Sequence, residues 1–157
     1  MKIGSDVPFF IKNKTARVGG KGNKVELVEN NLKDSLILVK PLGFGVSTKD
    51  AYNSFDELDE VRYANFEKIV ECLRNDNRKD LEKYIENGLE QGISERNTDI
   101  KMFKAILNSV VPGKKFFMSG SGSTYYTFVT EIERSQIETR LRTFVDNVKI
   151  IISKTIN

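Results

Sequence analysis

The order of segments predicted near the end of the chain constrains the fold most. Two strand-like segments flank a loop of small residues, and an amphipathic helix then leads into a β-branched segment. We expect a strand at 115–118, a loop at 119–123, a strand at 124–130, a helix at 135–147 and a strand at 148–152. Ser135 to Glu138 has the pattern of a capping box for this helix. With a central strand at 36–39, these segments predict an α+β protein: a ferredoxin-like sheet of about four antiparallel strands with helices packed on one face.

The first two thirds of the chain add a small strand group and a helix cluster. Segments 9–11, 15–18 and 24–28 are expected to form an antiparallel meander. Ser47 and Thr48 are a cap for a short helix. Apolar residues spaced three and four apart then predict three longer helices around 66–73, 81–89 and 100–110, separated by breakers at Asn75 to Asn77, Gly92 and Pro112-Gly113. No linker interrupts the pattern, so residues 1–157 are expected to form one domain.

The composition excludes several classes of chemistry. Because the chain has no histidine, proton transfer must use Asp, Glu, Lys, Tyr or Cys. The single Cys72 lies in an apolar helical stripe, which predicts a buried thiol in a reducing, cytoplasmic compartment. A net charge of +3 with alternating signs gives little support for nucleic-acid binding. No apolar run approaches the roughly 20 residues of a membrane helix and no signal-peptide pattern is present, so neither membrane insertion nor targeting is expected.

Asp6 is the first candidate for chemistry. It lies in the segment Gly-Ser-Asp-Val-Pro-Phe-Phe at residues 4–10, where Gly4 permits a tight turn and Pro8 biases Val7 toward extended geometry. This arrangement would present one carboxylate at the mouth of an aromatic strand. An ordinary turn or helix cap is the alternative interpretation.

Residues 119–124, Ser-Gly-Ser-Gly-Ser-Thr, are the second candidate. A two-residue turn would suffice between two strands, so a longer loop of glycines and hydroxyls indicates either a phosphate neighbourhood or a flexible hairpin with a bulge. The loop is not a Walker motif, because no lysine follows its second glycine. The other glycine cluster, Gly19 to Gly22, favours a hairpin turn.

Taken in order, these segments resemble the C-terminal half of the 4-diphosphocytidyl-2-C-methyl-D-erythritol kinase family, within the GHMP kinase superfamily. Residues 4–10 resemble the family's Gly-Ala-Asp-Val-Pro-Phe segment, and residues 118–124 resemble its third motif, with Ser123 in place of a proline. Residues 20–23 are similar to a Gly-x-Gly-Glu turn, with Asn23 replacing the acid. Residues 39–41 and 46–52 are similar to the strand that leads to the substrate-side helix.

The resemblance implies specific roles for residues of this sequence. Asp6 would be the catalytic base that accepts or orients the proton of the erythritol hydroxyl as it attacks the γ-phosphorus of ATP. Gly120, Ser121 and Gly122 would support the phosphate-binding site, and Ser47 and Thr48 would lie near the diphosphocytidyl sugar-alcohol substrate. Mg²⁺ would accompany the nucleotide, with no metal ligand expected from this chain.

The family's main nucleotide loop belongs to an N-terminal domain that this sequence does not contain. We therefore expect a fragment, a truncated reading frame or an expressed C-terminal domain, inactive when isolated. An apolar patch around Val7, Phe9 and Phe10 is expected to lie exposed and to promote self-association.

Two alternatives remain open at this level. Another GHMP member, such as a mevalonate-pathway or homoserine kinase, would share the same motifs. A ferredoxin-like RNA-binding module would instead stack bases on the aromatic side chains of Phe116, Phe117, Tyr125 and Tyr126. The alternative is that they are core residues, because adjacent pairs on strands place at least one ring inside.

Overall fold

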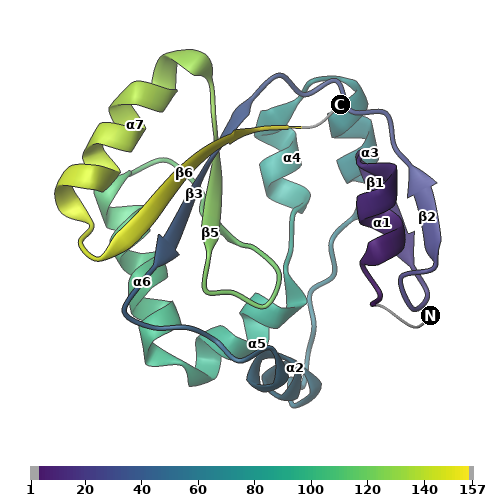
Figure 1. The fold of residues 1–157 in the computed structure, drawn as a ribbon, viewed down its shortest axis with the longest axis horizontal. Helices are drawn as coiled ribbons and strands as arrows, with labels where there is room; N and C mark the ends of the chain where they lie inside the picture. The colour runs from purple at the N-terminus through teal and green to yellow at the C-terminus, as the bar shows by residue number, and fades with distance from the viewer. Residues whose placement is uncertain (1–3, 156–157) are drawn as a thin grey trace.

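The computed structural model describes residues 4–155 and is built around one four-stranded antiparallel sheet (Figure 1). The strands are β3 (Ser35–Pro41), β4 (Phe117–Met118), β5 (Tyr125–Val129) and β6 (Val148–Lys154). Their order is β4-β5-β3-β6, so β3 is central and pairs with both β5 and β6. This order is that of a ferredoxin-like sheet, and the predicted fold class is confirmed.

The helices lie on both faces of the sheet, not on one face as expected, and they cover the two faces unequally. On one face, α5 (Gly88–Arg96), α6 (Thr98–Val110) and α7 (Glu131–Phe144) enclose the larger core with Ile37, Val39 and Tyr125. On the other, α3 (Phe66–Arg74) and α4 (Arg78–Tyr84) pack over the β5 side, around Phe117 and Phe128. Alternate residues of β3 therefore face different cores, because side chains alternate across a strand.

The N-terminal strand prediction was wrong. Residues 9–11 belong to helix α1 (Val7–Lys12), which is followed by a separate hairpin of β1 (Ala16–Gly19) and β2 (Lys24–Leu27). Pro8 lies in the first turn of α1, where a missing N–H removes no helical hydrogen bond. An apolar run this short is compatible with both the helix period and the strand period, so the pattern could not show that it is helical. The hairpin and its glycine turn were predicted correctly.

Most helices match the sequence pattern, with three corrections. Helix α2 (Thr48–Asp56) begins as expected, with Ser47 Oγ accepting from the Asp50 amide at 3.4 Å. The predicted helix around 81–89 is instead two helices, because α4 ends before Ile85 and Asn87 caps α5. Gly92 is not a breaker but a buried residue inside α5. The capping box of α7 is formed by Thr130 and Glu133, so the helix begins earlier than Ser135.

Two further expectations concern burial and membrane insertion. Cys72 is a buried free thiol on α3, as predicted, and burial raises its pKa. Across residues 4–155, no helix is long and apolar enough to cross a membrane.

Candidate functional site

The glycine-rich loop between β4 and β5 is closed by two backbone hydrogen bonds. The Ser119 amide donates to the Thr124 carbonyl at 2.8 Å, and the Gly122 amide donates to the Ser119 carbonyl at 3.0 Å. Gly120 and Gly122 have φ of 57° and 90°, in the left-handed region that favours glycine. A Cβ on Gly122 would also lie 2.7 Å from the Met118 sulfur. The loop therefore needs glycine at both positions.

The loop presents backbone donors that no protein group uses. Within the described part of the chain, the amides of Gly120 and Ser121 have no hydrogen-bond acceptor. Gly120 is exposed and Ser121 is half-buried. Free backbone N–H groups on a glycine loop can approach an anion closely, since no side chain obstructs them. The geometry is therefore suited to a phosphate or carboxylate group.

The structure brings two of the predicted site segments together. Thr48 Oγ1 at the start of α2 lies 3.2 Å from Ser121 Oγ in the glycine-rich loop, although 73 positions separate them in the sequence. Ser47 caps the same helix end and is exposed. A groove of about 460 Å³ adjoins this contact and is lined by residues of 40–46 and 122–124. Thr48 and Ser121 therefore present their hydroxyls at one place on the surface.

Asp6 lies outside this contact. It is the exposed N-cap residue of α1, its carbonyl accepts from the Phe10 amide at 3.1 Å, and its carboxylate makes no capping hydrogen bond. The hairpin turn packs directly against this segment, because a Cβ on Gly22 would overlap the carbonyl of Ser5. Three parts of the chain lie in the lower half of the view in Figure 1: the first turn of α1, helix α2, and the loop between β4 and β5. Among residues 4–155, no hydrogen bond joins Asp6 to the loop.

Asn87 and Glu90 support the loop and were not identified from the sequence. Asn87 Nδ2 donates to the carbonyls of Met118 and Gly120, each at 2.9 Å. Glu90 Oε2 accepts from the Met118 amide at 3.1 Å. The spacing Asn-x-x-Glu was an available signal, because it is typical of a helix N-terminus and would have marked the start of α5.

The aromatic residues proposed for RNA stacking are not available to bases. Phe116, Phe117 and Tyr125 are buried, and Tyr126 packs against Phe117 with ring centroids 5.6 Å apart. Burial raises the pKa of Tyr125, and burial also raises the pKa of Tyr126 to about 12. Three of these rings are core residues and Tyr126 is half-buried against the core, which contradicts the expectation for an RNA-binding module.

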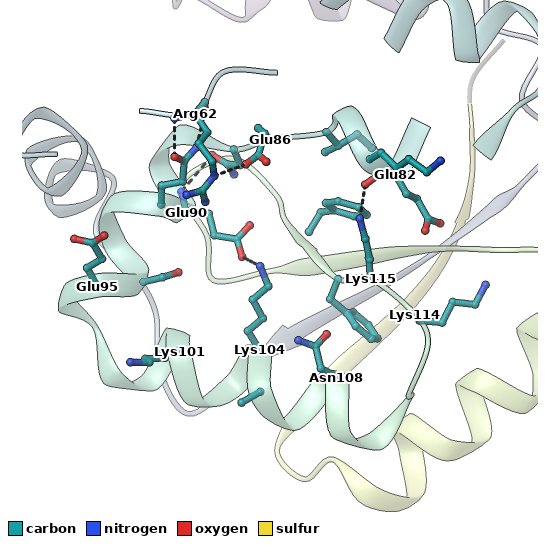
Figure 2. Close-up of a pocket in the computed structure, with 18 of the residues that line it drawn as sticks. Arg62, Glu82, Glu86, Glu90, Glu95, Lys101, Lys104, Asn108, Lys114 and Lys115 are labelled. Atoms are coloured by element: carbon teal, nitrogen blue, oxygen red, sulfur yellow. Dashed lines mark hydrogen bonds and ion pairs between the residues drawn. The ribbon is translucent and has the colours of Figure 1, made fainter. Parts of the chain in front are cut away.

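A larger hollow of about 850 Å³ lies beside α5, α6 and the segment before β4 (Figure 2). Its charged side chains largely bind one another or the backbone: Lys104 reaches Glu90 at 2.6 Å, and Lys115 donates to the Glu82 carbonyl at 3.1 Å. Neither Asp6 nor the glycine-rich loop lines it. Within residues 4–155, no group of three or more His, Cys, Asp or Glu side chains could hold a metal ion.

Sequence comparison relates the chain to a set of kinases. It is 76% identical over all 157 residues to a 4-diphosphocytidyl-2-C-methyl-D-erythritol kinase of Fusobacterium nucleatum, covering 53% of that protein. It is 35% identical over 137 residues to a protein of the same name from Clostridium novyi, covering 87% of this chain and 48% of that protein. The chain thus spans about half the length of these relatives. No protein-family model matches it.

Solved structures show the same fold. A crystal structure of 4-(cytidine 5'-diphospho)-2C-methyl-D-erythritol kinase superposes with a TM-score of 0.74 at 21% identity, over 98% of this chain and 54% of that one. A homoserine kinase from Cytophaga hutchinsonii superposes with a TM-score of 0.63 at 17% identity, over 85% of this chain and 45% of that one. Both likenesses establish the fold of the present chain.

Proposed function

We propose that this chain is a domain of a 4-diphosphocytidyl-2-C-methyl-D-erythritol kinase. The chain is a relative of these enzymes and corresponds to the C-terminal part of their sequence. Residues 1–157 would form the GHMP-type C-terminal domain. The complete enzyme would transfer the γ-phosphoryl group of ATP to the erythritol hydroxyl of the diphosphocytidyl substrate, in isoprenoid precursor synthesis.

One observation carries this proposal beyond the sequence match. The 3.2 Å contact between Thr48 and Ser121 joins the segment proposed to bind the cytidyl substrate to the loop proposed to support phosphate. Phosphoryl transfer requires donor and acceptor to be held together, because catalysis of this reaction depends on positioning and electrostatic stabilisation. Two hydroxyl-bearing segments from distant parts of the sequence meet where that requirement would be satisfied.

Each proposed role follows from chemistry that the residue can supply. Asp6 would accept the hydroxyl proton as the substrate oxygen bonds to the γ-phosphorus and the bond to ADP breaks. The free amides of Gly120 and Ser121, with Gly122 shaping the loop, would stabilise phosphate charge. Mg²⁺ would accompany the phosphates of the nucleotide.

The isolated chain is proposed to be inactive. Its relatives are about twice as long, and the N-terminal half would be needed to hold ATP against Asp6. We place the enzyme in the cytoplasm, where the single Cys72 would remain a reduced thiol. Nucleic acid and membrane are not proposed as partners.

A chimeric enzyme tests the proposal. The N-terminal half of the Fusobacterium nucleatum relative would be joined to this chain in place of its own C-terminal half, and ADP release would be measured with ATP and the diphosphocytidyl substrate. We expect turnover by the chimera and none by the 157-residue chain. Asp6→Asn in the chimera should lower kcat by about 10²- to 10⁴-fold, as expected for loss of general-base catalysis.

The controls separate this substrate from its alternatives. Homoserine and phosphomevalonate would be offered to the same chimera, because kinases of both names belong to structures of this fold. Turnover of either one alone would assign the chain to another GHMP kinase. An unchanged kcat in Asp6→Asn would remove Asp6 from the mechanism, and a folded, ATP-binding chimera without turnover of any substrate would overturn the kinase proposal.

A further inference from the structure

Asn87 uses its whole side-chain hydrogen-bonding capacity between helix α5 and the glycine-rich loop. Its Oδ1 accepts from the amides of Leu89 and Glu90, at 3.0 and 3.4 Å, and its Nδ2 donates to the carbonyls of Met118 and Gly120. The orientation of the carboxamide is determined by these partners, since a rotated group would face donors with donors and acceptors with acceptors. One side chain thus caps a helix and holds two loop carbonyls.

Glu90 completes the attachment one helical turn later. Its buried carboxylate accepts from the Met118 amide through Oε2 and pairs with Lys104 Nζ through Oε1 at 2.6 Å. Figure 2 shows Lys104 extending from α6 toward Glu90. Met118 therefore has both its N–H and its C=O bound to side chains of α5. The end of β4, where the loop begins, is held on both sides, by β5 and by α5.

Because the peptide group is planar, the hydrogen bond that holds the Gly120 carbonyl also fixes the direction of the Ser121 N–H. In a trans peptide the C=O of one residue and the N–H of the next point in opposite directions. Because Asn87 holds the Gly120 carbonyl toward α5, the Ser121 N–H points away from α5. That amide has no hydrogen-bond acceptor among residues 4–155.

We propose that Asn87, with Glu90 and Lys104 behind it, is a positioning residue that aims the Ser121 amide at the phosphate group of the nucleotide. This inference rests on the proposed function, because it takes the loop to be the phosphate-binding element. It assigns a role to the start of α5, which packs against α2 beside the loop.

The test compares two variants that both keep a helix cap. Asn87→Asp retains an oxygen that accepts from the amides of α5 but loses both N–H donors to the loop, since a carboxylate only accepts. Asn97 is the matched control, because it caps α6 through the Ile100 amide and, within residues 4–155, its side chain donates to no loop carbonyl. In the chimeric kinase, Asn87→Asp should raise the Kd of ATP about tenfold, consistent with losing two hydrogen bonds. Asn97→Asp should leave that Kd within twofold of the parent value.

A second measurement is independent of activity and of the added N-terminal half. In the 157-residue chain, amide order parameters from NMR relaxation should fall at Gly120 and Ser121 in Asn87→Asp and stay unchanged in Asn97→Asp. If Asn87→Asp does not fold, Asn87→Ser serves instead, because serine caps a helix but is too short to reach both carbonyls.

The outcomes separate this inference from the proposed function. A parent chimera without turnover counts against the proposed function, irrespective of the order parameters measured in the loop. An active parent whose Asn87 variants keep the Kd of ATP and the loop order parameters would overturn the positioning role alone. An equal loss in Asn97→Asp would also overturn it, because the effect would then come from general destabilisation.

Discussion

At the scale of single residues, Glu133 connects separate segments through one carboxylate oxygen. Its Oε2 accepts from the amide and hydroxyl of Thr130, at 2.9 and 3.1 Å, from Lys114 Nζ at 2.8 Å and from Arg78 Nη1 at 3.1 Å. Arg78 continues to Asp34 Oδ1 at 3.2 Å, just before β3. Burial alone would raise the pKa of Glu133, but hydrogen bonds from Lys114, Thr130 and Arg78 outweigh it and lower the pKa to about 2.

This pKa predicts a pH-dependent contribution to stability. Because the folded-state pKa lies below the ordinary value of 4.5, the contribution is fully present above about pH 4.5 and is lost as the pH falls toward 2. Glu133→Gln should lower the free energy of unfolding by about 1–2 kcal/mol at pH 7, less than the full pKa shift implies because the carboxylate is 35% exposed. The difference in the free energy of unfolding between Glu133→Gln and the parent protein should shrink toward zero near pH 2. Denaturant unfolding measured from pH 7 to pH 2 follows this difference.

The control for Glu133→Gln is Glu131→Gln in the same helical turn. Among the described residues Glu131 pairs only with Arg134, and it is 66% exposed, so its substitution should change stability little at any pH. Burial raises the pKa of Asp34, a shift of opposite sign. The Glu133 carboxylate is a smaller contributor to that shift, so most of the Asp34 effect cancels between the parent protein and the variants. A deficit in Glu133→Gln that stays constant from pH 7 to 2 would contradict the assignment.

At the scale of elements, the packing of α5 against α2 depends on Gly92. A Cβ at this position would lie 2.6 Å from the Ser54 carbonyl group and the Phe55 amide, which are backbone atoms and cannot move aside alone. Gly92→Ala should therefore destabilise the domain by about 1–3 kcal/mol. It should do so although alanine is the better helix former. Thermal unfolding of the chain measures the loss.

The matched substitution is Gly88→Ala in the first turn of the same helix. There the added methyl would meet the ring of Phe55 at 2.6 Å, and a side chain can rotate. Gly88→Ala should lower the stability of the domain less than Gly92→Ala does. The reverse order would show that the close approach of α5 to α2 does not depend on Gly92.

An element was predicted correctly where its sequence signal lies in neighbouring residues, and it was missed where its boundary depends on distant ones. The four core strands, α2, α3 and α6 were predicted from periodicity and caps, which are properties of neighbouring residues. The α4–α5 boundary was missed although Asn87 is a cap, because the apolar spacing continues across it. Gly92 was misread as a breaker because its role is to admit another helix, and no local pattern records which helix that is.

At the scale of the whole molecule, the N-terminal helix leaves apolar side chains exposed. Helix α1 has no buried residue, and Phe10 and Ile11 are 70% and 76% exposed. Val7 and Phe9, also predicted to lie in such a patch, are half-buried. Adjacent exposed apolar residues favour association in water.

We expect the 157-residue chain to self-associate as its concentration rises. Substituting Phe10→Ser and Ile11→Ser together should reduce the average mass measured by light scattering at high concentration. Ile132→Ser is the control, because Ile132 is the one apolar residue in the first turn of α7 and is 92% exposed. A monomer over a wide concentration range, or an equal effect of Ile132→Ser, would count against self-association through α1.

The architecture and the glycine-rich loop could be predicted from local sequence, because strand and helix periods, turn glycines and caps act between residues a few positions apart. The helical state of the Asp6 motif could not be predicted in this way. The neighbours of those motifs could not. Thr48 meets Ser121, and Asn87 holds Met118 and Gly120, only because α2 and α5 pack together beside the end of β4. These contacts join residues 31 to 73 positions apart and depend on buried side chains and backbone approach, which appear only when the domain is assembled.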